Sequence, residues 1–132
     1  MKDRVLFAAA ALVTALLLST ASGFAADAKA EITIAAQHAE LAAGSTNLAD
    51  VRMHLHHTLN CIEGPKGADF SKTELNPCQN TGDGAIPDSD NPTTTATLQT
   101  AITEATEGIA ANTLKAAQDA AGKVAATLKS VQ

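Results

Sequence analysis

The sequence predicts an all-α protein, an antiparallel four-helix bundle made of two helical hairpins joined by a long, disulfide-stapled loop. Apolar residues recur at spacings of three and four in four segments, as in helices with one buried face. The chain has no Trp or Tyr, so its core must come from Leu, Ile, Val and Ala, and Ala is the strongest helix former. A proline-rich stretch separates the first two segments from the last two.

The first residues predict a secretory signal peptide over residues 1–25. Lys2 and Arg4 precede an apolar run, and small residues lead to a cleavage site near Ala25 and Ala26. The run is shorter than the roughly 20 residues of a membrane span, so we expect no stable membrane insertion after cleavage. The mature chain, residues 26–132, has the size of one domain, and we expect it to be periplasmic or secreted.

The first hairpin is expected to consist of helices 28–43 and 48–63. Gly44, Ser45 and Thr46 interrupt the pattern, and Asn47 is a favourable N-cap for the second helix, with Asp50 in its first turn. This second helix carries a narrow apolar stripe of the kind that packs in a bundle: Leu48, Val51, Leu55, Leu59 and Ile62.

Residues 64–92 are expected to form the crossover loop. They hold all four prolines of the chain, and neither a helical nor a strand period is visible. A connection of this length in a small domain is usually functional, stapled or disordered. We expect Cys78 to staple it, and Phe70 and Ile86 to anchor it to the bundle.

The second hairpin is expected to consist of helices 94–109 and 113–130, with an N-cap among Thr93–Thr95. Their apolar positions alternate spacings of three and four, like the seam of a bundle helix. This hairpin has no His, Cys or aromatic residue, so we interpret it as scaffold.

Cys61 and Cys78 are the two cysteines of the chain. An even number in an exported domain favours a disulfide between them. Neither a C-x-x-C redox motif nor a haem-attachment motif is present.

Several function classes are disfavoured. The net charge of −5 and the lack of a basic patch argue against nucleic-acid binding. Asp83, Asp88 and Asp90 lack the spacing of a calcium-binding loop. No motif nominates a catalytic nucleophile, so we do not expect an enzyme.

The histidines are the candidate metal ligands, and three of the four fall in one short stretch of the second helix. On a helical wheel, His54 and His57 lie with Asp50 and Cys61 opposite the apolar stripe, while Met53 and His56 lie on a flank. Two imidazoles one turn apart form a workable chelate for copper, zinc or nickel. The alternative is an exposed polar face whose histidines are incidental.

His38 belongs to the first helix, between Ile34 and Leu41. Folding the hairpin at residues 44–46 brings it level with Met53 and its neighbouring histidines. His38, His56 and Met53 would then form a mixed imidazole and thioether set of the kind that copper tolerates. The expected site therefore draws on His38, His54, His56, His57 and Met53, with Asp50 as a further candidate.

The segment from Gln37 to Asn60, which includes His38-Ala39-Glu40, together with the Ala-rich C-terminal hairpin, resembles small exported metal-binding proteins of bacteria. Those proteins are short four-helix bundles with HAxxA-type repeats and histidines along the helices. The resemblance implies binding of divalent metals such as copper at His38, His54, His56 and His57. This chain departs from the pattern, with four histidines in one hairpin, two cysteines and a long crossover, so we expect a single ion.

Two other readings remain open. The protein could be a structural or interaction module that binds an unknown protein partner through the bundle face or the stapled loop, with Phe70 and Ile86 forming an exposed apolar patch. Haem or another organic ligand could bind in the bundle through His38, although an Ala-rich core offers little room.

Overall fold

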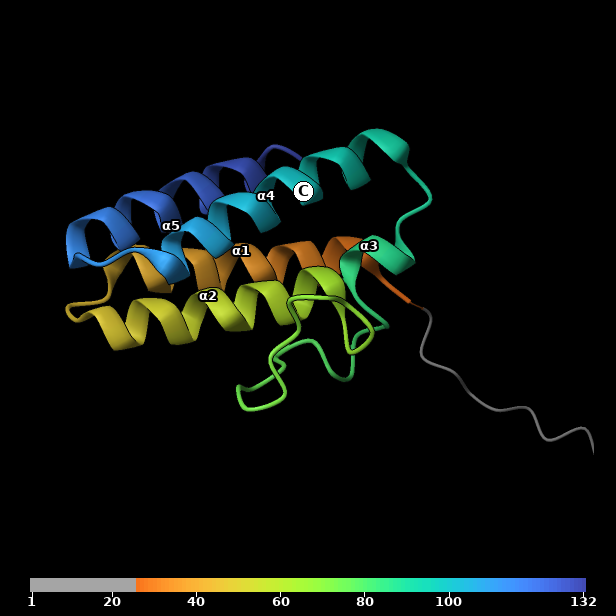
Figure 1. The fold of residues 1–132 in the computed structure, drawn as a ribbon. Helices are drawn as coiled ribbons and strands as arrows, with labels where there is room; N and C mark the ends of the chain where they lie inside the picture. Colours follow the sequence, from red (N-terminus) through yellow and green to blue (C-terminus); the bar gives the residue numbers. More distant parts are fainter. Residues whose placement is uncertain (1–25) are drawn as a thin grey trace, which may run out of the picture.

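The computed structural model describes residues 26–132, and every regular element in them is a helix (Figure 1). Four long helices, α1 (Ala28–Gly44), α2 (Leu48–Glu63), α4 (Pro92–Ala110) and α5 (Leu114–Lys129), are accompanied by one short helix, α3 (Ala85–Asp88). The predicted all-α class is confirmed for this part of the chain. The predicted signal peptide lies outside the described residues, and among residues 26–132 no helix is both long and apolar enough to cross a membrane.

Side chains cap the start of each long helix. The carboxylate of Asp27 accepts a hydrogen bond from the backbone N–H of Ala30 at the start of α1. Asn47 accepts from the N–H of Asp50 at the start of α2, and Thr113 accepts from the N–H of Ala116 at the start of α5. Each contact satisfies one of the N–H groups that a helix leaves unpaired in its first turn.

The third long helix begins earlier than expected. Its N-cap is Asn91, whose side chain accepts hydrogen bonds from the N–H groups of both Thr93 and Thr94, and not a residue among Thr93–Thr95. Pro92 occupies the first helical position, where its missing N–H costs nothing. The expectation was wrong because this Asn-Pro pair was taken as the end of a linker.

The crossover also contains a helix that was not expected. α3 has four residues, which is too short to produce a visible hydrophobic period. Ala85 in this helix is fully buried and Ile86 packs against the core, so the end of the crossover is attached to the long helices as the sequence predicted for Ile86.

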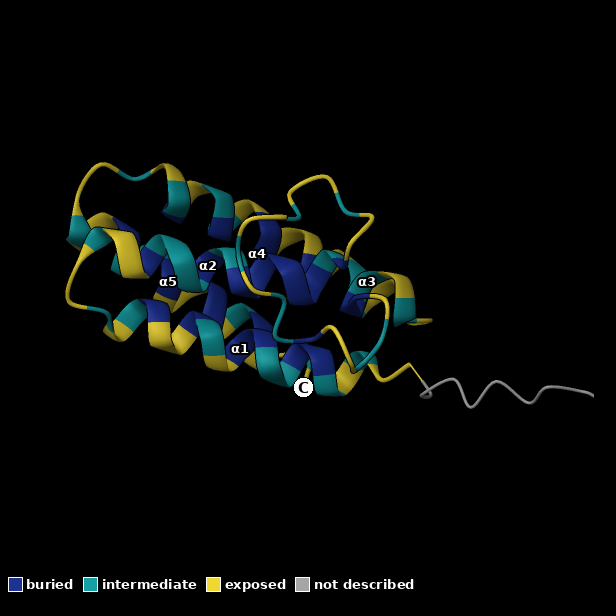
Figure 2. Ribbon diagram, turned by 90° about the horizontal axis from the view of Figure 1, so that it is seen from below, coloured by how far each residue is buried: buried dark blue, intermediate teal, exposed yellow. Residues whose placement is uncertain are grey.

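The four long helices enclose one alanine-rich core. α1 contacts α2 and α5, and α4 contacts α5 and α2; the buried faces of these helices are turned toward one another in Figure 2. Polar contacts also link the helix ends. The Arg52 guanidinium of α2 donates hydrogen bonds to the backbone oxygens of Ile109 and Ala111, where α4 ends. Gln118 of α5 likewise donates to the backbone oxygen of Ser45 in the α1–α2 turn.

The crossover loop lies along α2 and is fastened to it at two adjacent residues (Figure 1). Cys61 forms the predicted disulfide with Cys78, with a Cα–Cα distance of 5.1 Å. The fully buried Asn60 accepts a hydrogen bond from the N–H of Ser71 at 2.8 Å and donates to the backbone oxygens of Ser71 and Leu75 at 3.1 and 3.0 Å. One covalent and one hydrogen-bonded attachment therefore fix the loop on this helix.

Two glycines allow the loop to return past the end of α2. Gly64 and Gly84 have φ angles of 67° and 120°, which side chains with a Cβ rarely adopt. A Cβ at Gly64 would overlap the backbone oxygen of Asp83, and a Cβ at Gly84 would collide with the backbone of Glu63 and Gly64. The chain therefore needs glycine at both positions.

Glu31 of α1 is the buried acidic residue at this end of the molecule. Its side chain is fully buried, and its Oε1 accepts a hydrogen bond from the N–H of Gly84 at 3.0 Å. Burial, together with the nearby Asp88 and Asp83 carboxyl groups, raises the pKa of Glu31 to about 7, against the lowering effect of the Gly84 N–H. Glu31 is therefore largely protonated in the folded protein below neutral pH.

The raised pKa of Glu31 predicts that the protein loses stability as the pH rises from about 4.5 through 7, because the unfolded chain releases this proton first. Replacing Glu31 with Gln mimics the protonated carboxyl. We expect Glu31→Gln to match the parent near pH 5 and to be more stable at pH 8 by up to about 3 kcal/mol, measured by urea unfolding. Glu107→Gln, at an exposed position of α4, is the control; an equal pH dependence in parent and Glu31→Gln would contradict the assignment.

The disulfide predicts a second stability change. It spans 17 residues, and closing a loop of that length in the unfolded chain contributes about 3 kcal/mol. Full reduction should lower the free energy of unfolding by about this amount, while a Cys61→Ala/Cys78→Ala variant should not respond to reductant. An unchanged unfolding curve after reduction of the parent would show that the bridge does not stabilise the fold.

Candidate metal centre

Three of the four histidines meet between α1 and α2. The Nδ1 atoms of His38 and His54 are 3.3 Å apart, and one ring nitrogen from each of His38, His54 and His57 lies within 4.8 Å of the other two. The ring centroids are 5.0 to 5.6 Å apart. His38 and His54 are half-buried and His57 is buried, so the cluster lies at the edge of the core.

The packing of the hairpin brings these residues together. The hydroxyl of Thr58 on α2 lies 3.2 Å from the backbone oxygen of Ala35 on α1 and 3.0 Å from that of His54, and it shares its one hydrogen between them, so Thr58 and Ala35 face each other. One turn further along each helix, His38 faces the turn that begins at His54. Because residues three and four apart share a helix face, His54 and His57 both lie within reach of His38.

The spacing of the nitrogens suits a transition-metal ion. A tetrahedral ion with metal–nitrogen bonds of about 2.0–2.1 Å holds its ligand nitrogens about 3.3–3.4 Å apart. The His38–His54 pair already has this separation, which is long for a direct hydrogen bond. The remaining separations are at most 4.8 Å, so the ring nitrogens would approach one another by up to about 1.5 Å to complete a three-nitrogen set.

The cluster favours uncharged imidazoles. Burial, followed by the charges of the neighbouring His57 and His54, lowers the pKa of His38 to about 4. Burial also lowers the pKa of His57, followed by the effect of His54, and these outweigh the raising effect of Glu74. Neutral imidazoles are the form that binds metal ions, so His38 and His57 need release no proton on binding at neutral pH.

His57 has different surroundings on its two ring nitrogens. Its Nε2 is 3.8 Å from the Oε2 of Glu74 in the crossover loop. Its Nδ1 is buried and, like the Nδ1 of His56, has no hydrogen-bond partner among residues 26–132. A buried nitrogen without a partner costs free energy, and a bound ion would remove that cost.

The other candidate ligands are placed differently. His56 is half-buried and lies outside the three-histidine cluster. Asp50 is exposed, and its carboxylate accepts a hydrogen bond from the Asn47 side chain. Cys61 is in the disulfide and cannot bind a metal as a thiolate. Met53 is half-buried, and its participation remains a prediction.

The position opposite the apolar stripe does not leave His57 and Cys61 exposed, so the alternative of an exposed polar face does not hold for His57. His57 is 7 % exposed and Cys61 is fully buried, because the side of α2 opposite the apolar stripe is covered by the crossover loop. In addition, α1 approaches α2 on the flank that carries Thr58 and His54, whereas the Arg52 flank contacts the end of α4. His38 therefore groups with His54 and His57, and the expected set of His38, His56 and Met53 stays a prediction.

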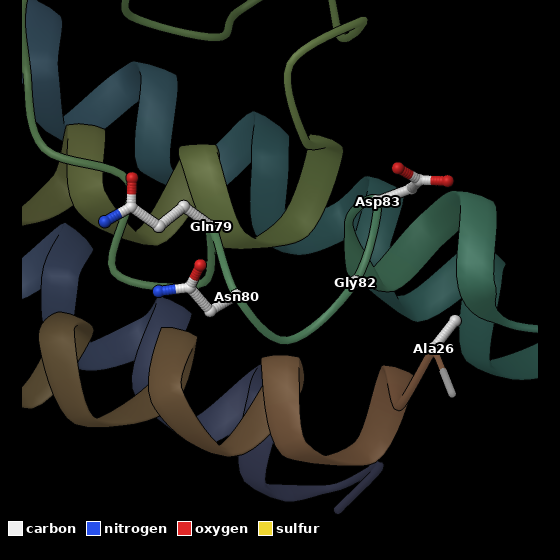
Figure 3. A pocket seen from close by; sticks show the side chains of 5 residues that line it. All are labelled: Ala26, Gln79, Asn80, Gly82 and Asp83. Carbon is white, nitrogen blue, oxygen red and sulfur yellow. The ribbon is translucent and has the colours of Figure 1, made fainter. Parts of the chain in front are cut away.

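A separate hollow lies where the crossover loop passes the start of α1 (Figure 3). Its volume is about 240 Å³, and it is lined by Ala26, Gln79, Asn80, Gly82 and Asp83. None of the four histidines lines it. The histidine cluster and this hollow are thus distinct features of the surface.

No protein-family description, curated protein or solved structure matches this chain. The resemblance to small exported histidine-bearing metal-binding proteins therefore remains a prediction from the residues.

Two residues near the cluster escaped the sequence analysis. Thr58 connects α1 to α2 beside the histidines, and Glu74 reaches His57 from the crossover loop. Thr58 could have been found as a hydroxyl residue next to the apolar stripe on the wheel. Glu74 carries no comparable signal, because its position depends on how a nonperiodic loop folds back.

The lowered pKa of His38 gives a direct prediction. In the metal-free protein the His38 ring should stay neutral until the pH falls to about 4, whereas in urea it should titrate near its usual value of 6.5. Because the unfolded chain takes up this proton first, His38 should reduce stability as the pH falls from about 6.5 toward 4. Histidine ring NMR signals followed over pH measure this; titration of His38 near 6.5 in the folded protein would show that the ring is solvated.

Proposed function

We propose that this protein is an exported binder of one divalent transition-metal ion, held by His38, His54 and His57. The observation that carries the proposal is the convergence of one ring nitrogen from each of these residues within 4.8 Å. The nitrogens come from two helices that are packed together and capped independently of any metal. Such a site needs little reorganisation on binding, which favours affinity.

Copper is the first candidate, followed by zinc and nickel. Imidazole nitrogens suit all three ions, and the affinity of a nitrogen site for divalent metals rises to a maximum at Cu²⁺. Magnesium and calcium prefer oxygen ligands, which this cluster does not supply from its three imidazoles. We propose one ion per chain, since the three grouped histidines form a single cluster.

The proposed scaffold is an antiparallel four-helix bundle in which the α1–α2 hairpin carries the ligands and the α4–α5 hairpin supports it. The contacts of α1 with α5 and of α2 with α4 support this arrangement. Export to the periplasm or outside the cell is supported by the basic and apolar N-terminal segment and by a disulfide that persists in oxidising compartments.

We propose a binding role and not an enzymatic one. The hollow beside the start of α1 is lined by residues other than the histidines, so it does not bring a substrate to the proposed ion. A role as a partner-binding module remains the second candidate, and one observation favours it: Leu75 of the crossover loop is 58 % exposed. The apolar patch expected from Phe70 and Ile86 is not the basis for this candidate, because Ile86 packs on the core.

The proposed function predicts Cu²⁺ or Zn²⁺ binding by the exported protein that depends on the three clustered histidines. His38→Ala, or the double variant His54→Ala/His57→Ala, should weaken the affinity by more than about 100-fold, since each loses direct ligands. Competition titration with a chelator measures the affinity, and circular dichroism checks the fold.

His56→Ala is the matched control, because His56 is on the same helix but outside the cluster. It should bind the ion like the parent protein. Binding that disappears in His56→Ala but survives in His38→Ala, or no binding in the parent at all, would refute the proposed site.

A further inference from the structure

Glu74 is an acidic residue beside the cluster, and the proposed function gives it no role. Its Oε2 is 3.8 Å from the Nε2 of His57, and its side chain is 34 % exposed whereas that of His57 is 8 % exposed. This distance is slightly longer than a hydrogen bond. A side-chain movement of less than about 1 Å would close it, which is similar to the movement that the ligand nitrogens themselves require.

The backbone on either side of Glu74 is attached to α2. Asn60, one turn after His57, donates hydrogen bonds to the backbone oxygens of Ser71 and Leu75 at 3.1 and 3.0 Å and accepts one from the N–H of Ser71, and the Glu74 backbone oxygen lies 3.4 Å from the same Asn60 nitrogen. The next residue, Cys61, forms the disulfide with Cys78 of the loop. The part of the crossover that carries this carboxylate is thus fixed beside His57 by contacts that do not involve the histidines.

The carboxylate of Glu74 makes the two ring nitrogens of His57 different. A neutral imidazole carries its proton on one nitrogen and a lone pair on the other, and the partner of the protonated nitrogen decides which is which. A carboxylate beside Nε2 favours the proton there. The lone pair is then on Nδ1, the nitrogen that is buried without a hydrogen-bond partner.

We propose that Glu74 is a positioning residue of the metal site, which accepts the Nε2–H of His57 and so presents the Nδ1 lone pair of His57 to the ion. Its negative charge also offsets part of the charge that a divalent cation brings to three neutral imidazoles. Metal-binding histidines in proteins commonly have such a carboxylate partner on their other nitrogen. This inference rests on the proposed function and extends the site from the α1–α2 hairpin to the crossover loop.

Two measurements on Glu74→Ala test the proposal. In the metal-free protein, long-range proton–nitrogen NMR should show His57 protonated on Nε2, and the variant should shift toward a mixture of both tautomers. In a Cu²⁺ competition titration, the variant should bind about 10- to 100-fold more weakly than the parent. Glu74→Gln, which keeps an acceptor oxygen but loses the charge, should keep the tautomer and lose only part of the affinity.

Asp69→Ala is the control, because Asp69 is an exposed acidic residue of the same loop and its removal changes the net charge equally. It should leave both the tautomer and the affinity within about two-fold of the parent. A Glu74→Ala variant with an unchanged His57 tautomer overturns the proposal: with weaker Cu²⁺ binding it makes Glu74 a direct ligand, and with unchanged binding it gives Glu74 no role. A parent protein that binds no Cu²⁺ but shows the tautomer change would overturn the proposed function while supporting the Glu74–His57 contact.

Discussion

The close approach of α1 to α2 is the constraint on which the rest of the structure depends. Ala35, Ala39 and Ala42 are completely buried on α1, and a threonine hydroxyl of α2 reaches a backbone oxygen of α1 directly. Small side chains let helix backbones approach closely, since the interaxial distance depends on the side chains at the contact. Ala35 lies one turn before His38 and faces Thr58 of α2, so this contact lets imidazoles of the two helices meet.

Much of the fold could be predicted from the sequence because it depends on local signals. Helical periodicity and the Asn47 cap indicate the all-α class, and an even number of cysteines after an expected signal peptide indicates the Cys61–Cys78 bridge. The hairpin turn also placed His38 level with the histidines of α2. The flank of α2 that faces α1 could not be predicted, because a helical wheel does not state on which side the neighbouring helix packs. Whether His54 or His56 lies beside His38 depends on which side of α2 faces α1.

The crossover loop shows the other limit of sequence reasoning. Asn60 lies in a helix that looks regular, and its buried hydrogen bonds to Ser71, Glu74 and Leu75 depend on tertiary contacts. The loop has no period from which the position of Glu74 could be read. Once the loop is fastened at Asn60 and Cys61, it covers the face of α2 that carries His57. The loop thereby gives His57 both its burial and its carboxylate neighbour.

Anomalous diffraction from crystals of the protein loaded with Cu²⁺ is the most direct test of the three-histidine site, because it locates the ion independently of any variant. We expect one strong peak per chain between α1 and α2, about 2.0–2.1 Å from a ring nitrogen of each of His38, His54 and His57. A peak bound to His56 without His38, or the absence of any peak at the cluster in fully loaded protein, would contradict it.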